Sequence, residues 1–301
     1  MSNSLNIDTA LAKLLVDRQF PQWRHLPIEP VQTSGWDNRT FHLGSQRVIR
    51  MPSAKEYAGQ AEKEQRWLPK LAPFLPLPIP TPIALGKPDA VYPWPWSINL
   101  WIPGNPAADC ECIHLSSFAV QLAEFLNALR GIDTRDGPPA GPQSFYRGGP
   151  LAIYNAETKQ AIALLKTEID AHLAREIWEI ALSSRWQNQP VWVHGDISVG
   201  NLLVREGHLS AVIDFGQLAV GDPACDLAIA WVFFKDKSRE AFLNTLKLDK
   251  DTVARGRAWA LWKALIVRSG IVTSSTRQKQ RASAVIHEVM HDYQRSQTRG
   301  I

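Results

Sequence analysis

Two apolar segments, each followed by polar residues, make up residues 191–216, which read VWVHGDISVGNLLVREGHLSAVIDFG. Asp196 follows the first segment, Asn201 comes five residues later, and Asp214 follows the second segment. Polar side chains at strand ends can meet a ligand while the strands fix their positions. Asn201 and Asp214 supply oxygen ligands of the kind that Mg²⁺ prefers. Asp196 is then free to accept a proton from a hydroxyl, so the segment predicts phosphoryl transfer.

The order and spacing of these residues match the protein-kinase signature H-R-D-x-x-x-x-N followed by D-F-G, with Gly195 in place of the arginine. The next residues, 221–228, read GDPACDLA. This set of motifs resembles the aminoglycoside phosphotransferase and choline kinase family, strongly over residues 191–231 and more faintly from about residue 34. The resemblance implies Mg²⁺-assisted transfer of the γ-phosphoryl group of ATP to a hydroxyl group of a small molecule.

The resemblance also implies roles within this block. Asp196 matches the catalytic aspartate, and Asn201 and Asp214 match the magnesium ligands. Asp226 matches a buried aspartate that braces the catalytic loop, and Asp222 helps in the same way. A further residue, His194, is interpreted as a packed histidine that shapes the loop rather than as a general base.

Upstream, the resemblance implies a nucleotide-binding set. Arg50, in the strand 48–52, would present a cation to the α- and β-phosphates, and Glu64 on the next helix, with Glu62 as the fallback, would pair with it. Ser34 and Gly35, followed by Trp36-Asp37-Asn38, would form the turn that covers the phosphates. Leu100 and Ile102 would form the hinge that holds adenine through its backbone. The family usually has lysine in place of Arg50, and the planar arginine fork binds differently, so GTP stays open as the donor.

The rest of the chain predicts an α+β, protein-kinase-like fold of two lobes. Residues 7–18 place Leu11, Leu14 and Leu15 on one helical face after Asp8 as a cap, and 57–71 return to helical spacing. Short extended segments fill 31–52 and 73–104, whereas the chain after residue 104 is expected to be mainly helical, including one long helix over 155–183. We therefore expect a nucleotide-binding lobe of antiparallel sheet at 1–102 and a mainly helical catalytic and acceptor lobe at 103–301.

Composition limits the partners. The 301 residues are 45% apolar and 21% charged, as in ordinary globular proteins, with no apolar run long enough to span a bilayer. No signal peptide is recognised, and the three cysteines do not make a disulfide framework, so a cytoplasmic protein is expected. The net charge of +4 comes without a dense basic run, so neither nucleic acid nor membrane is expected as a partner. A monomer and a dimer both stay open.

A rival motif lies near the end of the chain. His287, Glu288 and His291 form H-E-x-x-H, which on a helix is the signature of a zinc hydrolase. A catalytic zinc needs a third protein ligand, and only Asp292 follows as a candidate, so we keep this interpretation as a remote alternative. A nucleotide-binding pseudokinase that serves as an interaction module is the other alternative.

The acceptor is an alcohol that the motifs do not identify; the family suggests an antibiotic, such as an aminoglycoside or a macrolide, or a hydroxylated metabolite. Residues 271–301, where such enzymes often build the acceptor wall, carry five basic and two acidic residues. A polycationic aminoglycoside would favour an acidic pocket. This balance shifts the expectation towards a neutral or anionic acceptor.

Overall fold

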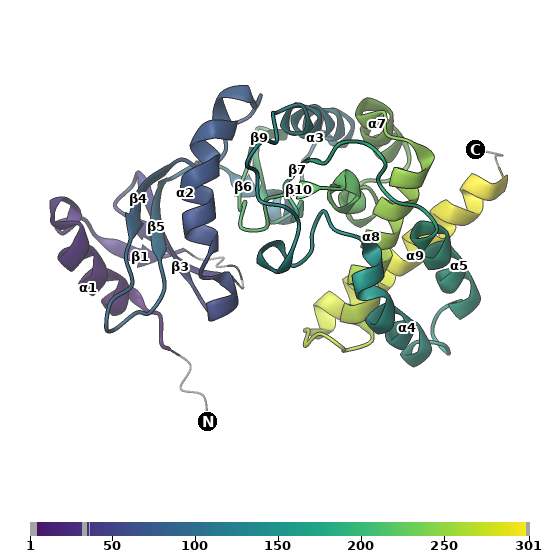
Figure 1. Ribbon diagram of the computed structural model, residues 1–301, viewed down its shortest axis with the longest axis horizontal. Helices are drawn as coiled ribbons and strands as arrows, with labels where there is room; N and C mark the ends of the chain where they lie inside the picture. Colours follow the sequence, from purple (N-terminus) through teal and green to yellow (C-terminus); the bar gives the residue numbers. More distant parts are fainter. Residues whose placement is uncertain (1–4, 32–34, 36, 299–301) are drawn as a thin grey trace.

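The computed structural model describes residues 5–31, 35 and 37–298, and its N-terminal part is an antiparallel sheet between two helices (Figure 1). The strand order is β1-β2-β3-β5-β4. The strands are β1 (Ile28–Pro30), β2 (Asn38–Leu43), β3 (Arg47–Pro52), β4 (Pro82–Gly86) and β5 (Trp96–Leu100). Helix α1 (Thr9–Gln19) packs on one face, and α2 (Gln60–Leu71) lies on the side of the helical lobe.

Helix α1 begins where the sequence predicts. The Asp8 carboxylate accepts the amide of Leu11 at 2.9 Å, which satisfies one of the free N–H groups of the first turn. Leu15 is fully buried against the sheet, but Leu14 of the predicted apolar face is 38% exposed. The residues of α1 that are buried are Ala12, Leu15 and Val16, so the buried stripe only partly coincides with the predicted face.

Helix α2 confirms the helical spacing at 57–71 and joins the two halves of the molecule. It follows a 3₁₀ turn (Lys55–Tyr57) and continues two residues beyond Pro69, which sits in its last turn. Trp67 of α2 packs against Trp192 of the other lobe, with ring centroids 5.0 Å apart. Buried apolar side chains of α2 thus belong to the large core of the C-terminal part rather than to the sheet core that α1 covers.

The C-terminal part is mainly helical (Figure 1) and holds a two-stranded and a three-stranded sheet. Strand β7 pairs with β10, and β6 with β8, which forms a hairpin with β9. The strands are β6 (Asn105–Pro106), β7 (Val191–Val193), β8 (Leu202–Arg205), β9 (His208–Val212) and β10 (Ala219–Gly221). The α-helices are α3 (Leu115–Arg130), α4 (Asn155–Leu164), α5 (Ala171–Leu182), α6 (Ile229–Val232), α7 (Asp236–Leu246), α8 (Lys250–Arg268) and α9 (Thr276–Thr298).

The single long helix expected over 155–183 is wrong. The chain leaves helical geometry after Leu164 and starts again at Ala171, giving α4 and α5. The Asp170 carboxylate accepts the amides of His172 and Leu173 at 3.1 and 3.0 Å, so this residue caps a new helix. Apolar periodicity runs across the break, which is why the spacing alone joined the two helices.

The α+β class predicted from the sequence is confirmed, with the five-stranded sheet in the first hundred residues and most of the helices after it. The boundary at residues 102 and 103 stays a prediction. Within the described ranges, no helix has the length and apolar character needed to cross a membrane. All three cysteines, Cys110, Cys112 and Cys225, are free thiols.

Candidate active site

The loop after β7 carries Asp196 and takes a shape that requires glycine before it. Gly195 has φ +83°, and a Cβ atom there would lie 2.6 Å from the carbonyl oxygen of Gln217. The arginine of the protein-kinase signature could therefore not occupy this position without moving the neighbouring chain. The H-G-D sequence is a consequence of this close approach.

His194 ties the loop to the segment after β9. The ring is fully buried, and its Nδ1 accepts the backbone amide of Asp196 at 3.1 Å. Its Nε2 lies 3.1 Å from the carbonyl oxygen of Ile213, so Nε2 carries the proton and donates it. Both ring nitrogens are engaged within the fold, which supports the interpretation of His194 as a residue that shapes the loop.

Asp226 holds the same loop by hydrogen bonds to its backbone. Its two carboxylate oxygens each accept a backbone amide at 2.8 Å, one from His194 and one from Gly195. Burial raises the pKa of Asp226, while His194 and the two amides act in the opposite direction. Asp222 accepts the amide of Ala224 and binds the buried guanidinium of Arg255 at 2.7 Å. These contacts support the bracing roles that the resemblance implies.

The Asp196 carboxylate has a hydrogen-bond donor on each oxygen. Asn201 donates its Nδ2 to Asp196 Oδ2 at 3.1 Å and to the Asp196 carbonyl at 2.9 Å. Lys263 of α8 donates its ammonium to Oδ1 at 3.1 Å. Burial works to raise the pKa of Asp196, but Lys263 first and then Arg147 and His194 outweigh it and hold the pKa below its usual range. The carboxylate is therefore ionised at neutral pH, which is the state that a proton acceptor requires.

Arg50, Glu64 and Asp214 form a second cluster between the lobes. Arg50 Nη1 binds the Glu64 carboxylate at 2.6 Å, and Nη2 binds Asp214 Oδ1 at 2.6 Å. Burial raises the pKa of Glu64 against the pull of Arg50, and Glu64 is 2% exposed. Asp214 has φ +66°, a left-handed conformation that is uncommon outside glycine and asparagine and that functional sites often hold. The pair of Arg50 with Glu64 is the contact that the resemblance implies.

The turn that would cover the phosphates is described only in part. Ser34 and Trp36 lie outside the described residues, and Gly35 is exposed. Asp37 accepts a hydrogen bond from Gln60 at 3.0 Å, and Gln60 packs so closely on Gly216 that a Cβ there would lie 2.6 Å from it. Burial raises the pKa of Asp37, and Asp214 and Asp196 add to this effect. Asp37 therefore lies within electrostatic reach of Asp196 and Asp214.

The residues that would hold a divalent ion are Asn201 and Asp214. The amide of Ile213 donates to the Asn201 carbonyl at 2.9 Å, which brings the two segments together. Over residues 5–31, 35 and 37–298, no group of three His, Cys, Asp or Glu side chains could form a metal cage. One carboxylate and one amide oxygen, completed by phosphates, are nonetheless a typical set for Mg²⁺. The donor chemistry therefore fits the ion that the sequence predicts.

The hinge residues stand at the end of β5, where the chain leaves the sheet. The amide of Leu100 donates to Thr81 at 2.9 Å, so Leu100 can offer a base only its carbonyl. Just before it, Asn99 is 1% exposed, and its Oδ1 has no hydrogen-bond partner. Asn99 shares a face of the sheet with Arg50, because their cross-strand partners are Val48 and Ser97. A buried amide without a partner beside the hinge marks Asn99 as a candidate base-contacting residue.

Sequence reasoning missed Lys263, Arg147 and Asn99. Lys263 is 67 positions from Asp196, and only the fold of α8 brings them together. One signal was available: Lys263 is the single charged residue within AWALWKALIV, residues 258–267. Strand β5 reads WSINL and alternates apolar and polar residues, so its pattern did not set Asn99 apart. A charged residue inside an apolar segment is the pattern that could have indicated Lys263.

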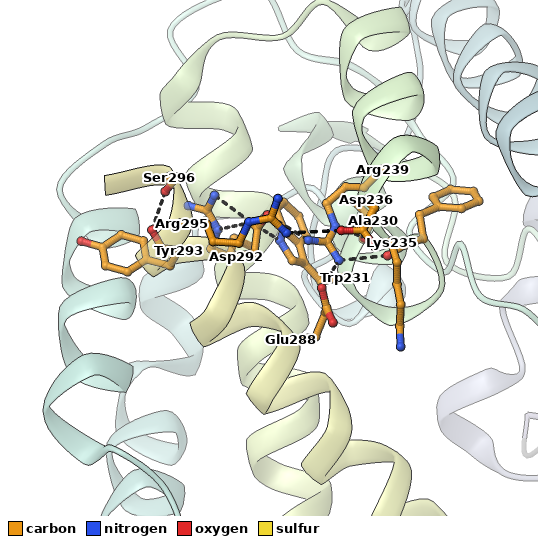
Figure 2. A network of polar contacts seen from close by, with 12 residues as sticks. Ala230, Trp231, Lys235, Asp236, Arg239, Glu288, Asp292, Tyr293, Arg295 and Ser296 are labelled. Atoms are coloured by element: carbon orange, nitrogen blue, oxygen red, sulfur yellow. Dashed lines mark hydrogen bonds and ion pairs between the residues drawn. The ribbon is translucent and has the colours of Figure 1, made fainter. Parts of the chain in front are cut away.

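The H-E-x-x-H motif does not form a metal site. His287 and His291 are exposed on α9, whereas Glu288 faces Arg239. Figure 2 shows the Arg239 guanidinium between Glu288 and Asp292, which it binds at 2.5 and 2.8 Å. Glu288, which a zinc hydrolase would use as a base, is thus the ion-pair partner of the buried Arg239. It lies on a different side of α9 from the two exposed histidines. The zinc interpretation is not supported.

Comparisons with known proteins found a matching family model and similar solved structures. The family model described as "Phosphotransferase enzyme family" matches residues 28–262. No curated protein matches the chain. Among solved structures, the GDP and kanamycin complex of APH(2")-IIia has a TM-score of 0.72 at 17% identity, over 94% of this chain and 99% of that one. The apoenzyme of macrolide 2'-phosphotransferase MphH from Brachybacterium faecium has a TM-score of 0.60 at 22% identity, over 93% and 97%.

A third structure is the streptomycin–ATP–APH(2")-IIa ternary complex, with a TM-score of 0.61 at 20% identity, over 95% of this chain and 98% of that one. At these low sequence identities, the similarity shows a shared fold and no more. The two-lobed, protein-kinase-like architecture predicted from the sequence is therefore confirmed over nearly the whole chain.

Proposed function

The chain belongs to the phosphotransferase enzyme family, and we propose that it transfers the γ-phosphoryl group of ATP to a hydroxyl group of a small molecule. The observation that carries this proposal is the convergence of Asp196, Asn201 and Asp214 between the lobes, with Arg50 bound to Asp214. The proposed division of labour gives nucleotide binding to residues 1–102 and acceptor binding to residues 103–301.

In the proposed mechanism, Asp196 orients the acceptor hydroxyl and takes its proton as the oxygen attacks phosphorus. The bond between the γ-phosphorus and the bridging oxygen breaks, and the nucleoside diphosphate leaves. Asn201 fixes the Asp196 carboxylate by donating to Oδ2, and Asp226 fixes the loop that carries it. The positions of these groups are set before the substrates bind, which is where such sites gain most of their rate.

Asn201 and Asp214 would hold Mg²⁺. Asn201 uses its Nδ2 for Asp196, which leaves its Oδ1 as a ligand, and Asp214 uses only Oδ1 for Arg50. Bound there, the ion would neutralise negative charge on the phosphates. Arg50 would add positive charge beside them, held in place by Glu64. The fork of Arg50, rather than a lysine, leaves GTP as the alternative donor.

Solved relatives bind aminoglycosides, and one is named a macrolide phosphotransferase. For this chain we propose a hydroxylated small molecule as the acceptor and no nucleic acid or membrane partner. Three free thiols suit a reducing compartment, so the cytoplasm is the proposed location.

The test is a nucleoside diphosphate release assay with ATP or GTP, with and without Mg²⁺, over a panel of hydroxylated metabolites and antibiotics. We expect Asp196→Ala to lose about 10²–10⁴ in rate, the usual contribution of a general base. Asp251→Ala, an exposed change in the first turn of α8, is the matched control and should keep full activity. Full activity in Asp196→Ala would refute the assignment, and nucleotide binding without any turnover would favour a pseudokinase.

A further inference from the structure

The charges around Asp196 are unevenly distributed. Lys263 approaches from α8 with its side chain 49% exposed, and contacts an Asp196 side chain that is 24% exposed. An ion pair this open contributes only about 0–1 kcal/mol to stability, so stability does not explain its place. It also occupies Oδ1, the oxygen not bonded to Asn201 and thus the one available to a hydroxyl.

Arg147 adds a second cation on the same side. Its guanidinium lies over two rings of α8, 4.9 Å from the centre of Trp259 and 4.7 Å from that of Trp262. Its Nε donates to Gln217 at 3.2 Å, and its Cβ approaches Gly195. Rings and amide together fix the orientation of Arg147 beside the catalytic loop, where it acts on Asp196 in the same direction as Lys263.

The acidic groups of this region do not balance these cations. Asp214 is paired with Arg50, and Asp37 is bound to Gln60; both belong to the nucleotide side. On the acceptor side, Glu157 accepts the indole N–H of Trp262 at 2.9 Å. Among the described residues, Lys263 forms an ion pair with Asp196 alone and Arg147 forms no ion pair, so an acceptor that displaces Lys263 from Asp196 meets cations without another carboxylate partner.

We propose that Lys263, supported by Arg147, recognises an oxyanion of the acceptor, so that the substrate is a hydroxylated carboxylate or phosphate ester rather than a polycation. This inference rests on the proposed function of the same site. On binding, the two ends of the Lys263–Asp196 pair exchange partners. The acceptor hydroxyl takes Asp196 Oδ1, and the acceptor oxyanion takes the ammonium.

The exchange adds no residue to the proposed mechanism of phosphoryl transfer. The hydroxyl proton moves to Asp196, the new oxygen–phosphorus bond forms, and the diphosphate leaves with the bridging oxygen. An acceptor ammonium at the same place would meet Lys263 and Arg147 at short range, where like charges repel strongly. The pair therefore selects against cations as well as for anions.

The experiment compares anionic acceptors with uncharged counterparts. Glycerate and gluconate would be assayed against their amides, glyceramide and gluconamide, and glycerol phosphate against glycerol. Kanamycin would serve as the cationic comparison. We expect the wild type to prefer the anionic members about tenfold or more in kcat/KM, the effect of one charged hydrogen bond. Lys263→Met should remove this preference by raising KM for the anions, and Lys263→Arg should restore most of it.

Hydrolysis with water as the acceptor separates oxyanion binding from the effect of Lys263 on Asp196. Because no oxyanion is bound during hydrolysis, any loss of that rate in Lys263→Met reports the contact with Asp196 alone. We expect the loss of kcat/KM with the anions to exceed the loss with water about tenfold or more. An equal loss with water and with anions would overturn the proposal, since Lys263 would then act on the transferred phosphoryl group.

Failure of this inference is distinguishable from failure of the function. Turnover with Asp196-dependent transfer, but with amides or kanamycin preferred to the anions, would refute the oxyanion site and leave the phosphotransferase intact. Absence of all nucleotide turnover, water included, would refute both.

Discussion

Removing the carboxylate of Asp226 should destabilise the protein and disable the catalytic loop. In Asp226→Ala, two buried backbone amides, those of His194 and Gly195, lose their acceptors. Each unpaired buried amide costs about 1–3 kcal/mol, so the loss is about 2–6 kcal/mol. The upward shift in the pKa of Asp226 shows that burying its charge already costs free energy. We therefore expect the lower half of that range, about 2–4 kcal/mol.

The measurement is urea unfolding followed by circular dichroism, with phosphoryl transfer measured on the folded fraction at low temperature. Against a total of about 5–15 kcal/mol, a loss of this size should lower the unfolding midpoint clearly. Asp17→Ala, an exposed change in α1, should shift the free energy of unfolding by less than about 0.5 kcal/mol. If Asp226→Ala unfolds at the wild-type urea concentration and keeps full activity, the loop is not held by this residue.

Two further predictions concern the nucleobase and the rejected zinc motif. Asn99→Leu should change the ratio of kcat/KM for ATP to that for GTP by about fivefold or more, because a buried amide can distinguish the amino and carbonyl edges of the two bases; an unchanged ratio would exclude contact with the base. The double variant His287→Ala/His291→Ala should keep wild-type transfer within about twofold and contain no less zinc after purification without chelator, since both side chains are exposed and away from the loop; lost activity together with lost zinc would revive the metal hypothesis.

The sequence predicts the architecture of this protein better than the details of its acceptor site. Residues 191–216 were decisive, because the spacing of Asp196, Asn201 and Asp214 reflects one local unit of loop and hairpin. Local signals also located the start of α1 at Asp8. The same reasoning joined α4 and α5, since a cap at Asp170 does not interrupt the apolar pattern around it.

What local pattern cannot supply is contact between distant segments. Lys263 contacts Asp196 only because the tertiary fold brings α8 to the catalytic loop. The residues around Lys263 in the sequence are those of a largely buried helix. The H-E-x-x-H motif fails for the related reason that the role of Glu288 is decided by its partner on another helix, Arg239. Both cases depend on tertiary structure rather than on spacing.

The glycine before Asp196 has a consequence for how such an enzyme is controlled. Because this position has no side chain, the residue before Asp196 cannot form an ion pair with a modified residue elsewhere in the chain. Its working geometry is instead secured permanently by an internal carboxylate. The loop that carries Asp196 is therefore held by contacts that form when the chain folds, and none of these contacts needs a modified residue.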